Sequence, residues 1–286
     1  MMKKLFISLL SRFRSLRYFN LVATYARNGS KVRIPVIKSL GSGNLWLSEL
    51  WMCEVLEILL PLKKGCFIDI GVNVGQSLIK LKLVDGTVPY LGFDPNPVCI
   101  YYTGELIREN KYENAVLVPV GLSSRNEMVT LNLYSDGASD SAASMVKDFR
   151  PHDRIFAKKF VASFEYEKIK ECLPQGDVCV VKIDVEGAEV EVFTGIRKLL
   201  LEKRPFVLIE VLPVYSEKNL VRWERQRQLE QLIRDSNYKL FMISASKTKF
   251  NSFKPLETIG VNTKIENSDY FLCPAESVSQ LTRHFQ

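Results

Sequence analysis

The segment CFIDIGVNVGQS, residues 66–77, constrains the fold of this chain more than any other feature. Its apolar run contains one acid, Asp69, and then turns through Gly71 and Gly75 with Asn73 between them. An apolar run that ends in a glycine-rich turn before a helix is typical of a buried parallel strand in an α/β protein. In such folds ligands bind beyond the carboxyl ends of the strands, where this turn lies.

Apolar strands and helical patterns alternate along the rest of the chain. Strands are predicted at residues 66–70, 88–93, 115–120, 178–184, 206–211, 238–243 and 270–273. Helices are predicted at about residues 48–61, 76–83, 97–110, 188–203 and 219–235. This order predicts a mostly parallel sheet with helices on both faces.

The alternation is interrupted between residues 121 and 164. MVTLNLY, residues 128–134, indicates an extra strand, and SDGASDSAAS, residues 135–144, an exposed loop. Long irregular stretches in a compact domain are often lids or binding loops. We therefore expect this segment to form a wall of the site for the second substrate, with a surface loop of no role as the alternative.

The net charge of +7 comes from the N-terminal segment. Nine of the 39 Lys and Arg residues lie within residues 1–48, which contain no acid, so the rest of the chain has 30 basic and 32 acidic residues. A nucleic-acid-binding domain would instead carry its basic residues across the folded body. Six scattered cysteines without a CxxC pair and only two histidines also argue against a metal site or a disulfide framework.

The N-terminal segment is predicted to be a basic helical arm. Its apolar residues recur at helical spacing between basic ones, at Leu5, Leu9, Phe13, Leu16 and Phe19. Its apolar run is far shorter than the roughly 20 residues that span a bilayer. Two interpretations stay open: residues 1–38 contact an anionic membrane surface, or the helix packs on protein. GSGN, residues 41–44, is predicted to be a hinge, which divides the chain into residues 1–47 and a body of residues 48–286.

Asp94 ends the second predicted strand, 19 residues after Gly75. An acid at this place can accept hydrogen bonds from both hydroxyls of a ribose, so the ligand is expected to contain a nucleoside. Dinucleotide folds need G-x-G-x-x-G, but here Asn73 and Gln76 stand where glycines are required. Asp69 would also repel a pyrophosphate, whereas it suits a ligand with an ammonium and a sulfonium. These features point to S-adenosylmethionine.

A third element, VCVVKIDVEGAEVEVFTG, spans residues 178–195. Asp184 ends its strand and is expected to face the ligand crevice. Glu186, Glu189 and Glu191 lie in or near the first turns of the next helix, where acids interact favourably with the helix dipole. The helix dipole is therefore an alternative explanation for the glutamates, more than for Asp184.

Together FIDIGVNVGQS, GFDPNP and VVKIDVEGAEVEVFTG, followed by RPFVLIEV, resemble the FkbM-type S-adenosylmethionine-dependent methyltransferases over about residues 48–212. The resemblance implies a Rossmann-like class I methyltransferase fold with a seven-stranded sheet whose last strand is antiparallel. It also implies methyl transfer to a hydroxyl of a saccharide, glycan or related natural product. By this resemblance the methionine end of the cofactor lies at Asp69, Gly71, Asn73 and Gly75, the ribose at Asp94 and the adenine near Leu122.

Two positions depart from the family pattern: Val72 replaces a common alanine, and Glu165 stands near a usual leucine–aspartate pair. For the reaction, Asp184 and Glu186 are the candidate acid pair that orients and deprotonates the hydroxyl, with His152 as the alternative base. No metal is expected.

Other functions remain open on sequence alone. They are N-methyl transfer, a methyltransferase-like binding scaffold without activity, and a nicotinamide oxidoreductase, for which the turn lacks phosphate room. The expected acceptor is a small-molecule or lipid-linked saccharide and no nucleic acid is expected. The expected location is the cytoplasm, with peripheral contact at the inner face of the membrane as an open possibility.

Overall fold

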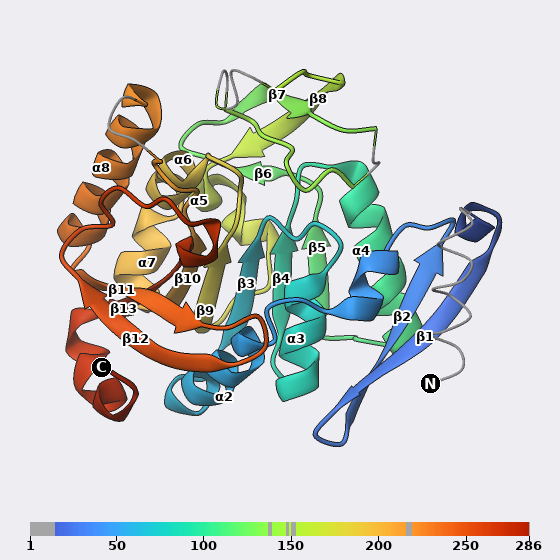
Figure 1. Cartoon of the computed structure of the whole chain (residues 1–286), viewed down its shortest axis with the longest axis horizontal. Helices are drawn as coiled ribbons and strands as arrows, with labels where there is room; N and C mark the ends of the chain where they lie inside the picture. Colours follow the sequence, from blue (N-terminus) through green and yellow to red (C-terminus); the bar gives the residue numbers. More distant parts are fainter. Residues whose placement is uncertain (1–14, 137–138, 147–148, 150–152, 216–218, 286) are drawn as a thin grey trace.

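The computed structural model describes residues 15–136, 139–146, 149, 153–215 and 219–285. Its centre is an eight-stranded sheet with the order β12-β11-β13-β10-β9-β3-β4-β5 (Figure 1). The strands are β3 (Cys66–Ile70), β4 (Tyr90–Phe93), β5 (Ala115–Val118), β9 (Val178–Ile183), β10 (Phe206–Glu210), β11 (Tyr238–Ala245), β12 (Phe250–Leu256) and β13 (Asp269–Pro274). The strands from β10 to β5 pair in parallel, and β13 is antiparallel to both of its neighbours. The predicted mostly parallel sheet with an antiparallel last strand is confirmed.

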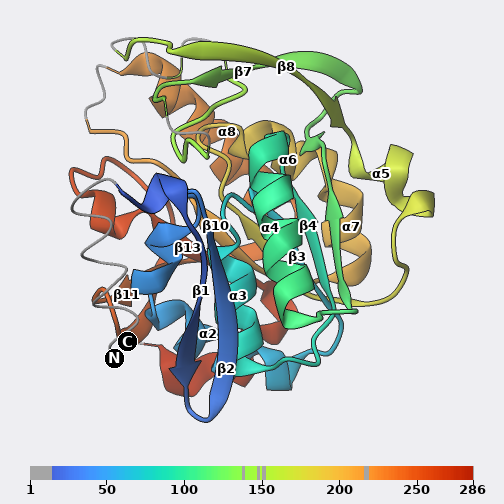
Figure 2. The same ribbon diagram turned by 90° about the vertical axis from the view of Figure 1, so that its right-hand side faces the viewer.

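Helices cover both faces of this sheet. One apolar core contains α2 (Trp51–Leu62), α3 (Gln76–Val84) and α4 (Pro97–Asn110), and the other contains α6 (Glu189–Gly195), α7 (Arg197–Lys203) and α8 (Leu220–Asp235) (Figure 2). The shorter helices are α5 (Tyr166–Ile169), η1 (Ser15–Tyr18), η2 (Ser42–Trp46), η3 (Lys170–Cys172), η4 (Ile265–Asn267) and η5 (Ala275–His284).

The continuous apolar runs of the sequence follow from this double coverage. Consecutive side chains of a strand point to opposite faces, so Phe67 packs in the core with α2 and α3 while Ile68 packs in the core with α6 and α7. Val180 and Val181 of β9 likewise pack in different cores. Both faces of the central strands are therefore apolar, as parallel sheets require.

The predicted count of seven strands is wrong by one, because β12 extends the sheet beyond β11. Its sequence, FNSFKPL, lacks a strand pattern, and Pro255 removes one backbone donor. Proline is tolerated on an edge strand, which β12 is. The strand is held by its aromatic residues: the ring of Phe253 stacks on Phe271 with 4.4 Å between centroids.

The prediction of a helical arm is wrong for residues 20–37, which form a β-hairpin of β1 (Asn20–Arg27) and β2 (Ser30–Ile37). Asn28 and Gly29 both have positive φ, which gives the tight turn that hairpins favour. Val32, Ile34 and Val36 of β2 are buried in the core with α3 and α4 (Figure 2). Leu5, Leu9 and Phe13 lie outside the described residues.

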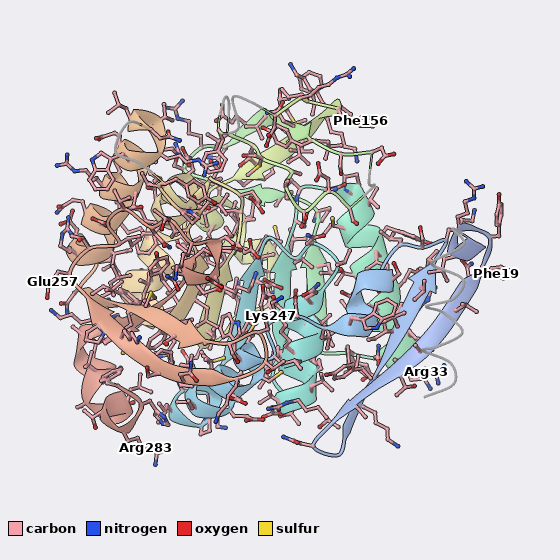
Figure 3. All side chains as sticks on the ribbon, in the orientation of Figure 1. Phe19, Arg33, Phe156, Lys247, Glu257 and Arg283 are labelled. Atoms are coloured by element: carbon pink, nitrogen blue, oxygen red, sulfur yellow. The ribbon has the colours of Figure 1, made fainter. Side chains whose placement is uncertain are left out.

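The expected hinge at residues 41–44 is packed on the body. Asn44 is buried, and its side-chain amide donates to the carbonyl of Val74 at 2.6 Å and to the hydroxyl of Tyr102 at 3.2 Å. This segment therefore touches the glycine-rich turn that follows β3. Arg33 of β2, labelled in Figure 3, forms an ion pair with Glu109 of α4.

A second sheet, with the order β6-β8-β7, lies beyond the carboxyl ends of the central strands (Figure 1). It consists of β6 (Gly121–Leu122), β7 (Glu127–Leu133) and β8 (Ala157–Phe164), and β7 confirms the extra strand predicted from MVTLNLY. Leu131, Leu133 and Val161 form its small core, and Phe156 projects outward beside it (Figure 3).

No helix among the described residues has a stretch long and apolar enough to cross a bilayer.

Candidate functional site

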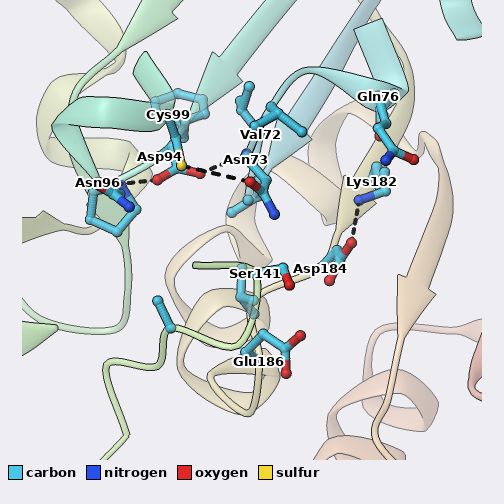
Figure 4. Close-up of a pocket in the computed structure, with 18 of the residues that line it drawn as sticks. Val72, Asn73, Gln76, Asp94, Asn96, Cys99, Ser141, Lys182, Asp184 and Glu186 are labelled. Carbon is cyan, nitrogen blue, oxygen red and sulfur yellow. Dashed lines mark hydrogen bonds and ion pairs between the residues drawn. The ribbon is translucent and has the colours of Figure 1, made fainter. Parts of the chain in front are cut away.

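A cavity of about 270 Å³ lies at the carboxyl ends of β3, β4, β9 and β10 (Figure 4). Of the predicted site residues it is lined by Gly71, Asn73, Asp94, Leu122, Asp184 and Glu186. Asp140, Ser141, Ala143 and Met145 also line it, so the long irregular segment forms one of its walls. The sheet thus brings together six candidates from four separate segments of the chain.

The glycine-rich turn is held between the two neighbouring strands. The backbone N–H of Gly71 donates to the carbonyl of Phe93 at 2.9 Å, and the N–H of Asp184 donates to the carbonyl of Ile70 at 2.9 Å. A Cβ atom on Gly71 would lie 1.8 Å from the carbonyl oxygen of Asp184. Only glycine permits this approach, and the φ of 91° at Gly71 also favours it.

Asn73 has a left-handed backbone, with φ of 47°. Asparagine adopts this conformation more readily than most residues. The conformation directs its backbone N–H to Oδ2 of Asp94 at 2.8 Å. The asparagine between the two glycines therefore serves to fix the acid of the next strand.

Asp94 is anchored at both carboxylate oxygens, because the N–H of Asn96 donates to Oδ1 at 2.7 Å. Burial raises the pKa of Asp94 to about 6, although both backbone hydrogen bonds oppose this rise. Each oxygen keeps a second lone pair on a rigid carboxylate that lines the cavity. This arrangement can accept two hydrogen bonds from adjacent hydroxyls.

The end of the cavity near Asp94 is partly apolar. Phe93, Cys99, Gly121 and Leu122 line it, and Leu122 is buried. Cys99 and Asp94 lie together on one side of Asn73 in Figure 4. Such a surface suits a flat aromatic group next to the two hydroxyls that Asp94 can bind.

Asp69 and Gly75, both predicted to hold the cofactor, do not line the cavity. Asp69 is fully buried behind the turn and its Oδ2 accepts a hydrogen bond from the hydroxyl of Tyr90 at 2.7 Å. Burial raises its pKa to about 6. Gly75 precedes α3, where a Cβ atom would lie 2.9 Å from Leu106. Both residues shape the turn from behind.

Asp184 lines the cavity and is paired with Lys182, a residue that the sequence analysis did not select. Nζ of Lys182 lies 2.9 Å from Oδ2 of Asp184 (Figure 4). It also lies 3.9 Å from Oδ1 of Asp69. Burial opposes ionisation of Asp184, but the Lys182 ammonium outweighs it and lowers the pKa of Asp184. Burial likewise opposes the charge on Lys182, and the two carboxylates outweigh it and raise the pKa of Lys182. The lysine thus keeps Asp184 ionised.

Glu186 lies beside Asp184 on the cavity wall, with a left-handed φ of 50° (Figure 4). Its carbonyl accepts a hydrogen bond from Oγ of Ser144 at 2.7 Å, which ties this turn to the loop that covers the cavity. Glu189 caps the turn instead: its Oε1 accepts from the N–H of Gly187 at 2.8 Å. Glu191 forms an ion pair with Arg225.

Glu49, Lys80 and Glu210 also line the cavity and were not selected from the sequence. Glu210 ends β10 on the edge where Asp184 follows β9, so its place in RPFVLIEV could have indicated it. Burial and the neighbouring Asp184 raise the pKa of Glu210 well above its ordinary value. Oγ of Ser268 donates to Oε1 of Glu210 at 3.1 Å.

His152 lies outside the described residues. Glu165 does not line the cavity; its Oε1 accepts from the side chain of Asn126 at 3.2 Å. Among the described residues, no group of three or more His, Cys, Asp or Glu is placed to hold a metal ion.

A family model described as "Methyltransferase FkbM domain" matches residues 69–240. No curated protein matches the chain. Among solved structures, the methyltransferase FkbM from Methylobacillus flagellatus KT is 12% identical with a TM-score of 0.45, and the alignment covers 73% of this chain and 43% of that one. This chain therefore spans less than half the length of that structure.

Two further solved structures have similar sequence identities and TM-scores to this chain. A putative caffeoyl-CoA O-methyltransferase from Staphylococcus aureus is 10% identical with a TM-score of 0.45, over 93% of this chain and 90% of that one. Aeropyrum pernix fibrillarin, solved with bound S-adenosyl-L-methionine, is 10% identical with a TM-score of 0.42, over 88% of this chain and 81% of that one. The family match covers more than half of the chain and includes the glycine-rich turn, Asp94, Asp184 and Glu210. The chain belongs to the FkbM methyltransferase family.

Proposed function

We propose that this protein is an S-adenosylmethionine-dependent methyltransferase that methylates a hydroxyl group of a saccharide, glycan or related natural product. The observation that carries the proposal is the placement of Asp94 and Asp184 on one cavity, on either side of the turn at Asn73 (Figure 4). The family match supports methyl transfer as the reaction class.

The residues present fit this cofactor. Asp94 has the rigid geometry to accept two ribose hydroxyls, and Leu122 with Cys99 offers an apolar surface for adenine. The exposed edge of the turn at Gly71 suits the cationic methionine end. A pyrophosphate fits poorly, because the N–H of Asn73 is bonded to Asp94 and several carboxyl groups line the cavity. This argues against a nicotinamide cofactor.

When bound, S-adenosylmethionine supplies a methyl group on a good leaving group, the sulfonium. The protein must then align the acceptor oxygen and accept its proton. Alignment contributes more, up to roughly 7–11 kcal/mol, whereas a positioned base contributes a factor of about 10²–10⁴. We assign the base role to Asp184, held ionised by Lys182, with Glu186 beside it to orient the hydroxyl. His152 remains the alternative base.

The acceptor would enter beside the loop that lines the cavity. Asp140, Ser141 and Glu186 present polar groups there, which can exchange hydrogen bonds with several hydroxyls. This polar wall and the family resemblance favour a saccharide. A lipid-linked saccharide would fit a protein whose N-terminal segment touches an anionic membrane.

The experiment that tests this proposal offers the protein isotopically labelled S-adenosylmethionine with nucleotide sugars, lipid-linked glycans and a matched set of amines. Mass spectrometry then shows which compound gains a methyl group and at which atom. Label on a sugar hydroxyl supports the proposal, and label on an amine nitrogen supports N-methyl transfer instead. Cofactor binding without transfer to any acceptor in cell extract would favour a binding scaffold.

A further inference from the structure

The cavity has a second polar end, on the opposite side of Asn73 from Asp94. Figure 4 shows Gln76 and Lys182 on that side. Ser77 and Lys80, one turn apart on α3, line this end together with Glu49. A ligand that places its ribose at Asp94 and passes Gly71 would bring its other end here.

Lys80 is a buried cation at this end, with 1% of its surface exposed. Its Nζ lies 3.0 Å from Oε2 of Glu49. Among the described residues, Glu49 is the acid that pairs with this ammonium. The two partners differ sharply in burial, because 53% of the Glu49 side chain is exposed. The carboxylate of Glu49 could therefore turn into water, whereas the ammonium of Lys80 could not.

Lys82, two residues further along α3, shows what a structural lysine looks like in this helix. It is also buried, but its Nζ donates to the carbonyls of Gly86 at 3.0 Å and Val88 at 2.7 Å and to Oδ1 of Asn114 at 2.8 Å. These three acceptors use all three of its protons. Lys82 does not line the cavity, whereas Lys80 does.

The backbone at Glu49 is itself unusual, with a left-handed φ of 51°. A residue with a branched or long side chain rarely adopts this conformation unless the surroundings impose it. The N–H of the next residue, Leu50, donates to the carbonyl of Lys247 at 3.2 Å, which fixes the segment against the loop between β11 and β12. The backbone of Glu49 is thus fixed beside the cavity, while its exposed carboxylate can still turn.

From these contacts we propose that Lys80 binds the α-carboxylate of the methionine end of S-adenosylmethionine, and that Glu49 pairs with Lys80 until that carboxylate replaces it. The inference rests on the proposed function for its cofactor. One carboxylate exchanges for another, so the buried ammonium keeps a counter-charge throughout. The carbonyl edge of the turn at Gly71 remains for the ammonium of the same ligand.

The test compares S-adenosylhomocysteine with its decarboxylated analogue, which lacks only the α-carboxylate, by calorimetric titration at low salt. A hydrogen-bonded charge pair is worth roughly a tenfold or larger change in affinity. The wild-type protein should therefore bind S-adenosylhomocysteine at least about tenfold more tightly than the analogue. In Lys80→Met this preference should fall to within about threefold, while Lys82→Met, a matched change on the same helix, should keep it.

Glu49→Gln provides an independent arm, because Glu49 is half-exposed and its replacement leaves the core intact. It should tighten binding of S-adenosylhomocysteine severalfold and change binding of the analogue less. An unchanged preference in a folded Lys80→Met protein, or weaker binding in Glu49→Gln, overturns the inference and leaves the proposed function standing. If wild-type protein binds neither compound, the proposed cofactor is wrong and the inference falls with it.

Discussion

The ammonium of Lys182 lies 2.9 Å from the carboxylate of Asp184, at the point where β9 ends and the cavity begins. The same ammonium lies 3.9 Å from Asp69, which is buried behind the turn. One lysine thus compensates two carboxylates, one facing the ligand and one inside the protein. Asp184 is therefore ionised and oriented before any acceptor enters.

If Asp184 and Glu186 handle the acceptor proton, Asp184→Asn and Glu186→Gln should each lower turnover by at least about tenfold. Binding of S-adenosylhomocysteine should change only a few-fold, because both changes keep the side-chain shape. Steady-state kinetics together with calorimetry would separate the two effects. Glu165→Gln is the matched control, since Glu165 does not line the cavity. Normal turnover in both variants with loss of activity in His152→Ala would identify His152 as the base.

Gly71→Ala should destabilise the fold and weaken cofactor binding together. A Cβ atom at this position would lie 1.8 Å from the carbonyl of Asp184, so the ends of β3 and β9 must separate. Because this clash adds to the strain of the positive φ, we expect a loss of about 2–4 kcal/mol in the free energy of unfolding. Urea denaturation measures it. Gly86→Ala, where a Cβ atom would meet nothing within 4 Å, should cost less than about 1 kcal/mol. Equal losses in the two variants would contradict the tight approach at Gly71.

Glu210 predicts a pH dependence of stability. Burial and Asp184 raise its pKa, so the folded protein keeps a proton that the unfolded chain releases above about pH 4.3. As the pH rises from about 4.3 towards the raised pKa of Glu210, the free energy of unfolding falls by up to about 1.4 kcal/mol per pH unit. Glu210→Gln removes this proton uptake, so its stability relative to wild type should rise between pH 5 and 8. Urea denaturation at each pH measures the free energy of unfolding. If it depends on pH in the same way for wild type and Glu210→Gln, the pKa of Glu210 is not raised. Glu202→Gln, at an exposed position, is the control.

One of the two open interpretations of the N-terminal segment is contact with an anionic membrane surface. Residues 1–14 carry four basic residues, and each contributes about 1 kcal/mol near an anionic surface. Deleting residues 1–14 should reduce co-sedimentation with vesicles that contain phosphatidylserine, and raised salt should do the same. The deletion stops before β1 because β2 is part of the core. If the full-length protein ignores these vesicles at low salt, the segment has another role and a lipid-linked acceptor loses its support.

Sequence patterns predicted the central sheet well because its strands are apolar on both faces. Phe67 and Ile68 pack in different cores, so neither could be polar. The patterns failed at the edges, where one face or one end of a strand is exposed. Residues 20–37 were assigned to a basic helical arm from a pattern that ends at Phe19, although Asn28–Gly29 and the alternation in SKVRIPVI favour a hairpin. At β12 the stabilising contacts are aromatic and come from distant residues such as Phe271.

The site was predictable where a residue ends a parallel strand. Asp94 and Asp184 both line the cavity for this reason. Asp69 is the next-to-last residue of β3, and its side chain bonds to Tyr90 and does not line the cavity, so strand position alone misled. Lys80 and Glu49 became visible only in three dimensions, because they lie 31 residues apart in the sequence. Lys182 pairs with Asp184 two residues away, but its second partner, Asp69, lies on another strand.

The central claim is that the cavity binds S-adenosylmethionine through Asp94, and calorimetric titration with S-adenosylhomocysteine tests it most directly. Wild-type protein should bind this compound and not NAD. Its affinity should fall about tenfold per pH unit below about pH 6, because ribose hydroxyls donate to the ionised form of Asp94. Asp94→Ala should cost about 1.5–3 kcal/mol of binding free energy, while Asp177→Ala at an exposed site should cost nothing measurable. Undiminished affinity in Asp94→Ala, or tighter binding of NAD than of S-adenosylhomocysteine, would contradict the account.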